Sequence, residues 1–365
     1  MLNKKAYSAI DLSVCRNAQI GIKMNDSNCP LISIIIPVYN TDEEQFKKCI
    51  DSVCGQSLRN IEIIVVDDGS DENHRKIIDN AATADCRVKI IHKLNGGVSS
   101  ARNMGLDIAS AAYVMFVDSD DWIDENCCEK AFKMAVSENT DIVMWRYIKE
   151  YSGKSVEVDI YPESGLRFDY WKKQFNPFDM RLMGMCWMKL YKKSIISKLR
   201  FNEELTNGED VEFNFRVFER MASAVYINEP FYHYRRNDAS AVRRYIKDMP
   251  ERYKKTLNVM EQDVRKAKRM KSHLARAYYS FTAISYLVLN MNYIFAEENK
   301  VPLYKKMEQL KNLSFEKPYS IAISRAESLE LPITRKMSLI FAKYHFYVGI
   351  YMIMMIKAQE ENLRQ

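Results

Sequence analysis

Residues 113–123 read YVMFVDSDDWI, an apolar run that ends in a cluster of carboxylates. Tyr113–Val117 has the length and composition of a strand that is buried on both faces. Asp118 and Asp120 come at its carboxyl end, where buried charge is costly unless something compensates it. A divalent metal bridging a diphosphate would do so, because Mg²⁺ and Mn²⁺ favour one or two carboxylates together with phosphate oxygens. The alternative is that Asp120 or Asp124 caps the helix that follows.

Similar apolar runs lie on both sides of this stretch, and residues at helical spacing fill the intervals between them. Alternation of strand and helix predicts parallel strands joined by right-handed crossovers. We therefore expect the first 150 residues or so to form a doubly wound sheet. Its other strands are expected at Leu31–Val38, Ile61–Val66, Val88–Ile91 and from Ile142 onward.

Polar clusters follow three of these strands. They read PVYN at residues 37–40, DDGS at residues 67–70 and DSDD at residues 118–121. Ligands of doubly wound sheets bind outside the carboxyl ends of the strands, so the three clusters should meet at one edge. There, Asp68 and Asn40 can bond the edge of a nucleobase, while Ser70 or Asp71 caps the next helix.

A glycine-containing loop, Asn95-Gly96-Gly97, precedes a predicted helix that carries Arg102. An arginine near a helix start, beside the same sheet edge, suits a phosphate or a nucleobase. A surface salt bridge is the alternative. The turn after the first strand, PVYNTDEEQ, contains no glycine, and no Walker A sequence occurs. A Rossmann dinucleotide site and a P-loop are therefore excluded.

Composition limits the remaining possibilities. The chain has 365 residues, of which 47% are hydrophobic, enough for one large domain and an appendage. Residues 1–29 are mixed and polar, lack the apolar core of a signal peptide, and are expected to form an arm. The eight cysteines lack the paired spacing of a zinc site. We interpret them as reduced thiols of a cytosolic protein.

Positive charge is concentrated late in the chain. The net charge is +6, and Arg243–Arg276 holds twelve Lys and Arg against four Asp and Glu. Such a segment indicates an anionic partner surface, a membrane or a nucleic acid, or simply a solvated helix face. The apolar stretches Leu274–Phe295 and Ser338–Ile356 are interpreted as core helices or interfacial membrane helices, since neither makes a convincing span.

Between these regions the alternation of strand and helix weakens. Glu209–Met221 is a good amphipathic helix, and Cys186–Leu199 also looks helical. Val225–Ile227 and Phe231–Tyr234 are predicted as two strands around Pro230, and the chain is predicted to be helical from about residue 250.

Four blocks together resemble the family 2 glycosyltransferases of the GT-A fold: LISIIIPVYN, IEIIVVDDGSDE, NGGVSSARNMGLDIAS and YVMFVDSDDWI. Their order and spacing cover residues 31–145. Three later segments are similar to acceptor-side and terminal motifs of the family: CWMKLY at 186–191, GED at 208–210 and PFYHYR at 230–235.

The resemblance implies a Rossmann-like, mostly parallel sheet flanked by helices and followed by a helical C-terminal region. The GT-A domain would span residues 30–240, with a nucleotide-binding half at 30–150 and an acceptor half at 151–240. Residues 241–365 would be the helical, basic region. The implied reaction is inverting transfer of a sugar from a UDP-sugar to a glycan or a lipid-linked glycan.

The resemblance also implies roles for single residues. Asp120 would be the direct ligand of Mn²⁺ or Mg²⁺, Asp210 the general base, and Glu209 a residue that positions the acceptor. A base at this place takes the proton of the acceptor hydroxyl as the new bond forms; capping of the helix at 209–221 is the alternative. His233 is a weaker candidate for the metal. The residues expected at the donor are Pro37, Val38, Tyr39, Asn40, Asp68, Arg102, Asp118 and Ser119.

Two other functions stay open: a nucleotidyltransferase that makes a nucleotide sugar, and a non-catalytic module that binds sugars or an anionic surface. The first usually needs a glycine-rich basic loop after the first strand, which PVYN does not resemble. A nucleic-acid partner is not expected. The expected location is the cytoplasm, including the inner face of the cytoplasmic membrane as a peripheral protein.

Overall fold

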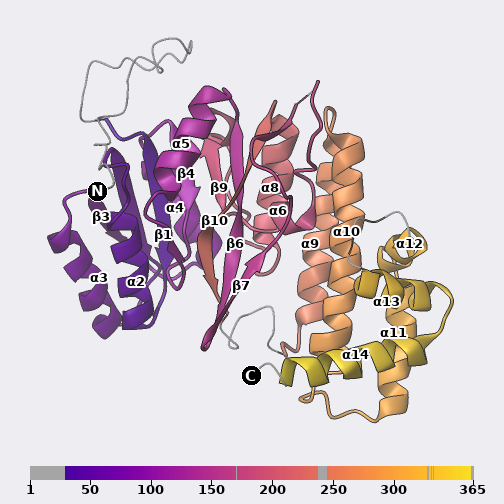
Figure 1. Cartoon of the computed structure of the whole chain (residues 1–365). Coiled ribbons are helices and arrows are strands. Elements are labelled where there is room, and N and C mark those ends of the chain that lie inside the picture. The colour runs from indigo at the N-terminus through magenta and orange to yellow at the C-terminus, as the bar shows by residue number, and fades with distance from the viewer. Residues whose placement is uncertain are drawn as a thin grey trace, which may run out of the picture.

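The computed structural model describes residues 29–169, 171–236, 245–326, 329, 331 and 333–362. Almost all of the predicted N-terminal arm, residues 1–28, lies outside these residues. A central sheet is flanked by helices, and a helical region adjoins its later strands (Figure 1). The strands are β1 (Ile32–Val38), β2 (Ile61–Asp67), β3 (Val88–His92), β4 (Tyr113–Phe116), β5 (Trp122–Ile123), β6 (Ile142–Tyr151), β7 (Lys154–Val158), β8 (Leu166–Phe168), β9 (Lys189–Lys192) and β10 (Ala224–Arg235).

The strand order is β3-β2-β1-β4-β9-β6-β10-β5, with β7 on β6 and β8 on β10. The pairs β1–β2, β2–β3, β1–β4 and β6–β10 are parallel, whereas β9 runs antiparallel to β4 and β6. The predicted α/β fold with flanking helices is confirmed, and the sheet is mixed. In register, Val38 lies opposite Asp67 and Ile35 opposite Phe116, so β1, β2 and β4 end at one edge.

The helices around the sheet follow the expected capping rules in part. Asp42 and Asp71 accept hydrogen bonds from the first backbone N–H groups of the helices that follow them. Asn126, rather than Asp120 or Asp124, is at the N-cap position of α5. These helices are α2 (Glu43–Cys54), α3 (Glu72–Ala84), α4 (Val98–Ile108), α5 (Cys127–Ser137), α6 (Met180–Met183), α7 (Lys193–Ile196) and α8 (Glu209–Arg220).

Two sequence-based predictions need correction. The helix predicted for residues 186–199 is wrong, because this segment contains β9 and the short α7. Pairing of β9 with both β4 and β6 overrides the helical pattern. The two strands predicted around Pro230 are a single strand, β10, whose pairing with β6 shifts register at that proline.

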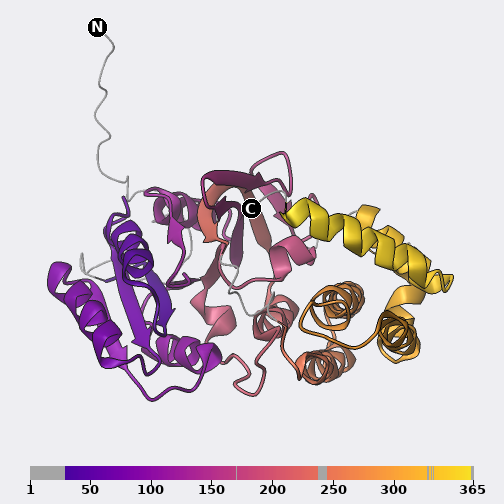
Figure 2. The same cartoon turned by 90° about the horizontal axis from the view of Figure 1, so that it is seen from below.

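The predicted helical C-terminal region is confirmed. Its elements are α9 (Met249–Lys266), α10 (Lys271–Leu289), the π-helix η1 (Asn290–Ile294), α11 (Leu303–Phe315), α12 (Tyr319–Ser324), α13 (Ile333–Lys343) and α14 (Tyr347–Asn362). In the view from below, α14 runs along the outer side of this region (Figure 2). Among the helices that the structure describes, none is both long and apolar enough to cross a membrane.

One continuous apolar core joins the sheet to the C-terminal helices, and it includes Ile34 of β1 as well as Leu257 and Tyr286. The C-terminal helices come especially close to the start of α8. Gly208 has a φ of +76°, and a Cβ atom there would approach Phe281 and Thr256 to 2.9 Å. The C-terminal helices therefore pack directly against the start of α8.

Candidate active site

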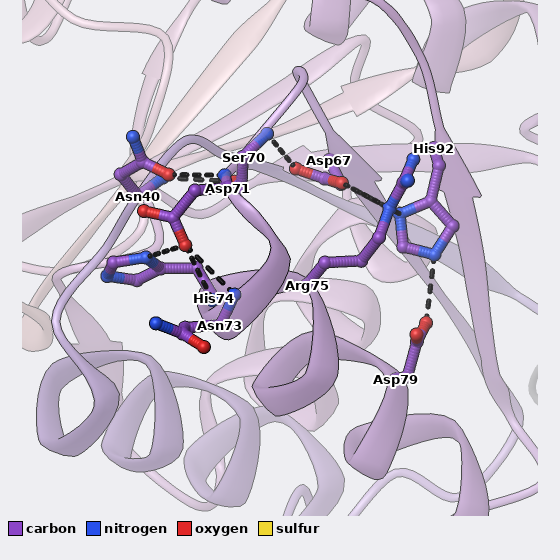
Figure 3. A network of polar contacts seen from close by, with 9 residues as sticks. All are labelled: Asn40, Asp67, Ser70, Asp71, Asn73, His74, Arg75, Asp79 and His92. Atoms are coloured by element: carbon purple, nitrogen blue, oxygen red, sulfur yellow. Dashed lines mark hydrogen bonds and ion pairs between the residues drawn. The ribbon is translucent and has the colours of Figure 1, made fainter.

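The ends of β1 and β2 are held together by a network of polar contacts (Figure 3). The Asn40 side-chain oxygen accepts from the Asp71 N–H at 2.9 Å, and the Asn40 N–H donates to Ser70 Oγ at 3.0 Å. Asn40 has a φ of 46°, the left-handed conformation that asparagine tolerates. Its side-chain oxygen thus organises the loop, while the neighbouring Tyr39 is 56% exposed and presents a ring at the sheet edge.

Asp67 and Asp68 have different partners. Asp67 accepts from the Ser70 N–H at 2.8 Å and contacts His92 Nδ1 at 2.7 Å. Burial opposes ionisation of Asp67, but these bonds leave its pKa below the ordinary value. Asp68 accepts from the N–H groups of Gly96 and Gly97 at 3.0 and 2.7 Å and from Lys93 at 2.5 Å. Contact of Asp68 with a nucleobase stays a prediction.

Arg102 connects the two halves of the site. It is buried, and its Nη2 donates to Asp118 Oδ1 at 3.0 Å while its Nη1 donates to Asp210 Oδ1 at 2.6 Å. A longer contact of 3.4 Å reaches Glu209 Oε1. The structure therefore places Arg102 among three carboxylates, rather than in a surface salt bridge, and joins Asp118 to the predicted base through one guanidinium.

The members of the 118–121 cluster differ in their surroundings. Asp121 is buried, and it accepts from Tyr232 Oη and from the Arg235 N–H, both at 2.7 Å. Among the described residues, no other residue donates a hydrogen bond to the Asp120 carboxylate. Burial and then the charge of Asp118 raise the pKa of Asp120 to about 6. Ser119 bonds Thr41 Oγ1 at 2.6 Å and so ties this loop to the end of β1.

This excess of negative charge fits a divalent cation. Three carboxylates contact the Arg102 guanidinium, and two more lie beside Arg235. The Arg235 Nε–H is donated to the backbone carbonyl of Asp120 at 3.0 Å, and its backbone N–H to the Asp121 carboxylate. Within the described ranges, no group of three or more His, Cys, Asp or Glu is arranged to hold a metal. A divalent metal at this place would be held mainly by Asp120 and by phosphate oxygens of a ligand.

The acceptor-side acids stand at the start of α8. Asp210 Oδ2 accepts from the Cys186 N–H at 3.2 Å, so both of its oxygens have partners. Burial and then the charge of Asp210 raise the pKa of Glu209 to about 7, against the opposing effect of Arg102. These two acids and Asp118 thus lie around one guanidinium, although they come from distant parts of the chain.

The loop that contacts Asp210 is fixed by side chains that the sequence did not single out. The buried Lys189 ammonium donates to the carbonyls of Leu182 and Met185. Asn214 donates to the carbonyls of Met183 and Met185 at 2.7 and 3.0 Å. Burial lowers the pKa of Lys189 to about 7. The lysine inside the apolar run CWMKLY could have indicated a buried ammonium group.

His233, the weaker metal candidate, and Trp187, from the CWMKLY segment, have other contacts than those of the acids around Arg102. His233 contacts Glu150 at 2.7 Å and Asp124 at 3.1 Å and stacks on Trp122, so its ring nitrogens do not face Asp120. Trp187 is buried and stacks on Tyr232 with ring centroids 4.4 Å apart. Tyr232, whose hydroxyl also accepts from the Asp118 N–H at 3.2 Å, was missed by the sequence analysis.

The sequence model described as "Glycosyl transferase family 2" matches residues 33–200. Glycosyltransferase GlyG of Streptococcus pneumoniae is 32% identical over 230 residues, which are 58% of this chain and 73% of GlyG. The chain belongs to glycosyltransferase family 2. This membership confirms the resemblance that the four sequence blocks indicated.

Two other proteins are similar to this chain over different shares of their length. EpsH of Bacillus subtilis is 36% identical over 230 residues, and the match spans 61% of this chain but only 65% of EpsH. The crystal structure of S. aureus TarS residues 1–349 in complex with UDP-GlcNAc superposes with a TM-score of 0.64 at 19% identity. It covers 90% of this family 2 chain and 92% of the TarS chain, and supports the GT-A fold.

Proposed function

We propose that this protein is an inverting glycosyltransferase that moves a sugar from a UDP-sugar to a hydroxyl of a glycan or lipid-linked glycan. The observation that carries the proposal is the cluster at Arg102, where Asp118 from the donor side and Asp210 from the acceptor side share one guanidinium. The reaction needs a leaving-group site and a base close together, and this cluster supplies both.

On the donor side, Tyr39 presents an exposed ring for the uracil. The loops of Asn40 and Asp68 would form the base pocket together with Pro37 and Val38, which are buried at the end of β1. Asp118, Ser119 and Arg102 would lie toward the ribose and diphosphate. Asp120 would hold Mn²⁺ or Mg²⁺, which supplies neutralisation of the charge that develops on the UDP leaving group.

On the acceptor side, Asp210 would take the proton of the acceptor hydroxyl while that oxygen attacks C1 of the donor sugar and UDP leaves. Glu209 would bind the acceptor, because among the described residues its carboxylate has only a long contact with Arg102. One displacement inverts the configuration at C1, and no covalent enzyme intermediate is needed.

The expected location belongs to the same proposal. A UDP-sugar donor together with a lipid-linked acceptor would put the enzyme in the cytoplasm at the inner face of the membrane, where cationic side chains would favour anionic lipids. The seven cysteines that the structure describes are free thiols, two of them exposed, which suits a reducing compartment.

The deciding experiment is a panel of UDP-sugars incubated with Mn²⁺, read as release of UDP and beginning with UDP-GlcNAc, the ligand of TarS. Release of UDP from one donor supports the proposal, and faster release with a glycan acceptor strengthens it. Formation of pyrophosphate from UTP would indicate nucleotidyl transfer instead. Failure of UDP to bind in the presence of Mn²⁺ would contradict the proposed donor site.

A further inference from the structure

The C-terminal helix α14 is apolar on both its inner and its outer side. Ile350 is buried toward the neighbouring helices. Val348, Met352, Met355 and Ile356 recur at helical spacing and are each about half exposed. A helix that is apolar all round is normally covered by protein or by lipid. Among the described residues, nothing covers this outer side.

Aromatic side chains extend the exposed strip beyond the start of α14. Tyr344 and Phe346 lie in the turn between α13 and α14, and Tyr344 is 68% exposed. Phe315, at the end of α11, stacks on His345 with ring centroids 5.0 Å apart and is also exposed. The outer face is defined as Phe315, Tyr344, Phe346, Val348, Met352, Met355 and Ile356.

Most of the charged residues on α13 and near the end of α11 are cationic, although Glu308 is also exposed on α11. Residues 347–356 carry no charged side chain, and α13 carries cations without an acid. Lys311 and Lys317 are exposed near Phe315, and the Lys343 ammonium lies 5.7 Å from the ring centre of Tyr344. The adjacent acid, Glu316, is ion-paired with Lys254 at 3.2 Å.

This charge pattern indicates what kind of surface covers the outer face. A symmetric contact between two copies of the chain would bring lysines close to lysines. An anionic bilayer offers apolar acyl chains to the outer face and phosphate groups to the lysines around it.

The position of the helix agrees with the location of the active site. In Figures 1 and 2, α14 lies at the end of the molecule where β1, β2 and β4 finish, and it runs toward the sheet. The α9–α10 turn, with Arg265, Lys266, Lys268 and Arg269, lies at the opposite end in Figure 1. The basic stretch predicted from sequence therefore does not share one surface with the apolar helix.

We infer that the outer face is an interfacial membrane anchor, which lies on an anionic bilayer and turns the active-site edge toward the lipid headgroups. Its helix lies in the interface and does not span the membrane. The orientation of the active site toward the membrane rests on the proposed function. The binding of the outer face to lipid does not depend on turnover and can be measured separately.

The test is co-sedimentation of the full chain with vesicles, without donor or metal. Vesicles of phosphatidylcholine are compared with vesicles containing about 30% phosphatidylglycerol. The apolar variant is F346S with M352S, and the charge variant is K311E with K317E. The control is W171S, which removes an exposed aromatic side chain far from the outer face. Trp171 is 87% exposed and follows β8, which pairs with the first residues of β10, at the sheet edge opposite the carboxyl ends of the strands.

The wild type is expected to bind the anionic vesicles more strongly. The apolar variant should lose about tenfold or more in partitioning, and the charge variant about fivefold for each lysine. W171S should bind like the wild type, and thermal denaturation should show all variants folded. Equal binding of both vesicle types, or unchanged binding of the apolar variant, overturns the inference.

A dimer in sedimentation velocity that the apolar variant abolishes would also overturn it, because the outer face would then join two copies. UDP binding with Mn²⁺ is measured separately on the same samples. Loss of UDP binding would contradict the proposed function and leave the vesicle result intact, so the two failures are distinguishable.

Discussion

Asp210 is the residue on which the proposed chemistry depends most directly. Asp210→Asn keeps the size of the side chain but removes the proton acceptor, so turnover should fall about 10²- to 10⁴-fold. Affinity for UDP and Mn²⁺ should stay within about threefold, because Asp210 is not proposed to touch the donor. UDP release and calorimetric UDP binding measure the two effects.

The matched control is Asp107→Asn, which removes the charge of an exposed aspartate that pairs with Arg200 on the outer side of α4. This variant should retain wild-type turnover. Unchanged turnover in Asp210→Asn would exclude this residue as the base and direct attention to Glu209.

Glu209 should make the stability of the folded protein depend on pH. Its pKa is raised to about 7 by burial and by Asp210, against about 4.3 in an unfolded chain. Between these values the folded state keeps a proton that the unfolded state has lost, so stability falls as pH rises from about 5 to about 7. Urea unfolding without metal should show that Glu209→Gln is the more stable protein at pH 8, by roughly 1 to 3 kcal/mol. Parallel pH profiles for the two proteins would contradict this assignment.

At the scale of elements, the start of α8 depends on the helices behind it. Gly208→Ala places a Cβ atom 2.9 Å from Phe281 and Thr256 in a left-handed backbone conformation. We expect a loss of about 1 to 3 kcal/mol in stability, together with lower turnover because Glu209 and Asp210 shift. Thermal denaturation and UDP release measure these effects.

Gly153→Ala is the control for backbone strain alone. Gly153 has a φ of +77°, and a Cβ atom there would meet nothing within 4 Å. It should cost about 1 kcal/mol without changing turnover. Equal turnover in the two glycine variants would show that packing against α10 does not position the acids.

The buried Lys189 ammonium holds the loop that precedes β9. Lys189→Met removes the donor to two buried carbonyls, Leu182 O and Met185 O, and should destabilise the protein by about 2 to 5 kcal/mol. Lys198→Met, at an exposed position after α7, should change stability by less than about 0.5 kcal/mol. Equilibrium unfolding distinguishes the two, and a small effect at Lys189 would show that the loop is held by other contacts.

The sequence was informative where chemistry depends on local pattern. Apolar runs ending in Asp68 and Asp118, combined with parallel topology, placed these residues at one sheet edge without any tertiary information. The pairing of Arg102 with Asp210, 108 residues away, has no local pattern. β9 was mistaken for a helix because Lys189 interrupts its apolar character and its burial depends on neighbours that fold from elsewhere.

For the molecule as a whole, the C-terminal helices and the sheet share one core, so neither part is expected to be stable alone. A chain that ends at Arg236 would lack Thr256 and Phe281 and would expose the side of α8 that α9 and α10 cover. It should unfold at least about 10 °C below the full chain or fail to fold. An unfolding temperature equal to that of the full chain would contradict this dependence.

The place of β9 between β4 and β6 has a consequence for synthesis of the protein on the ribosome. Until residues 189–192 have emerged, β4 has an unpaired edge, and one side of β6 stays unpaired until β10 is made. At about 5–20 residues per second, the interval from the end of β4 to the end of β10 is on the order of 10 s. During that time the nascent chain exposes apolar strand edges. We therefore expect chaperones to engage the growing polypeptide before residue 235 is translated.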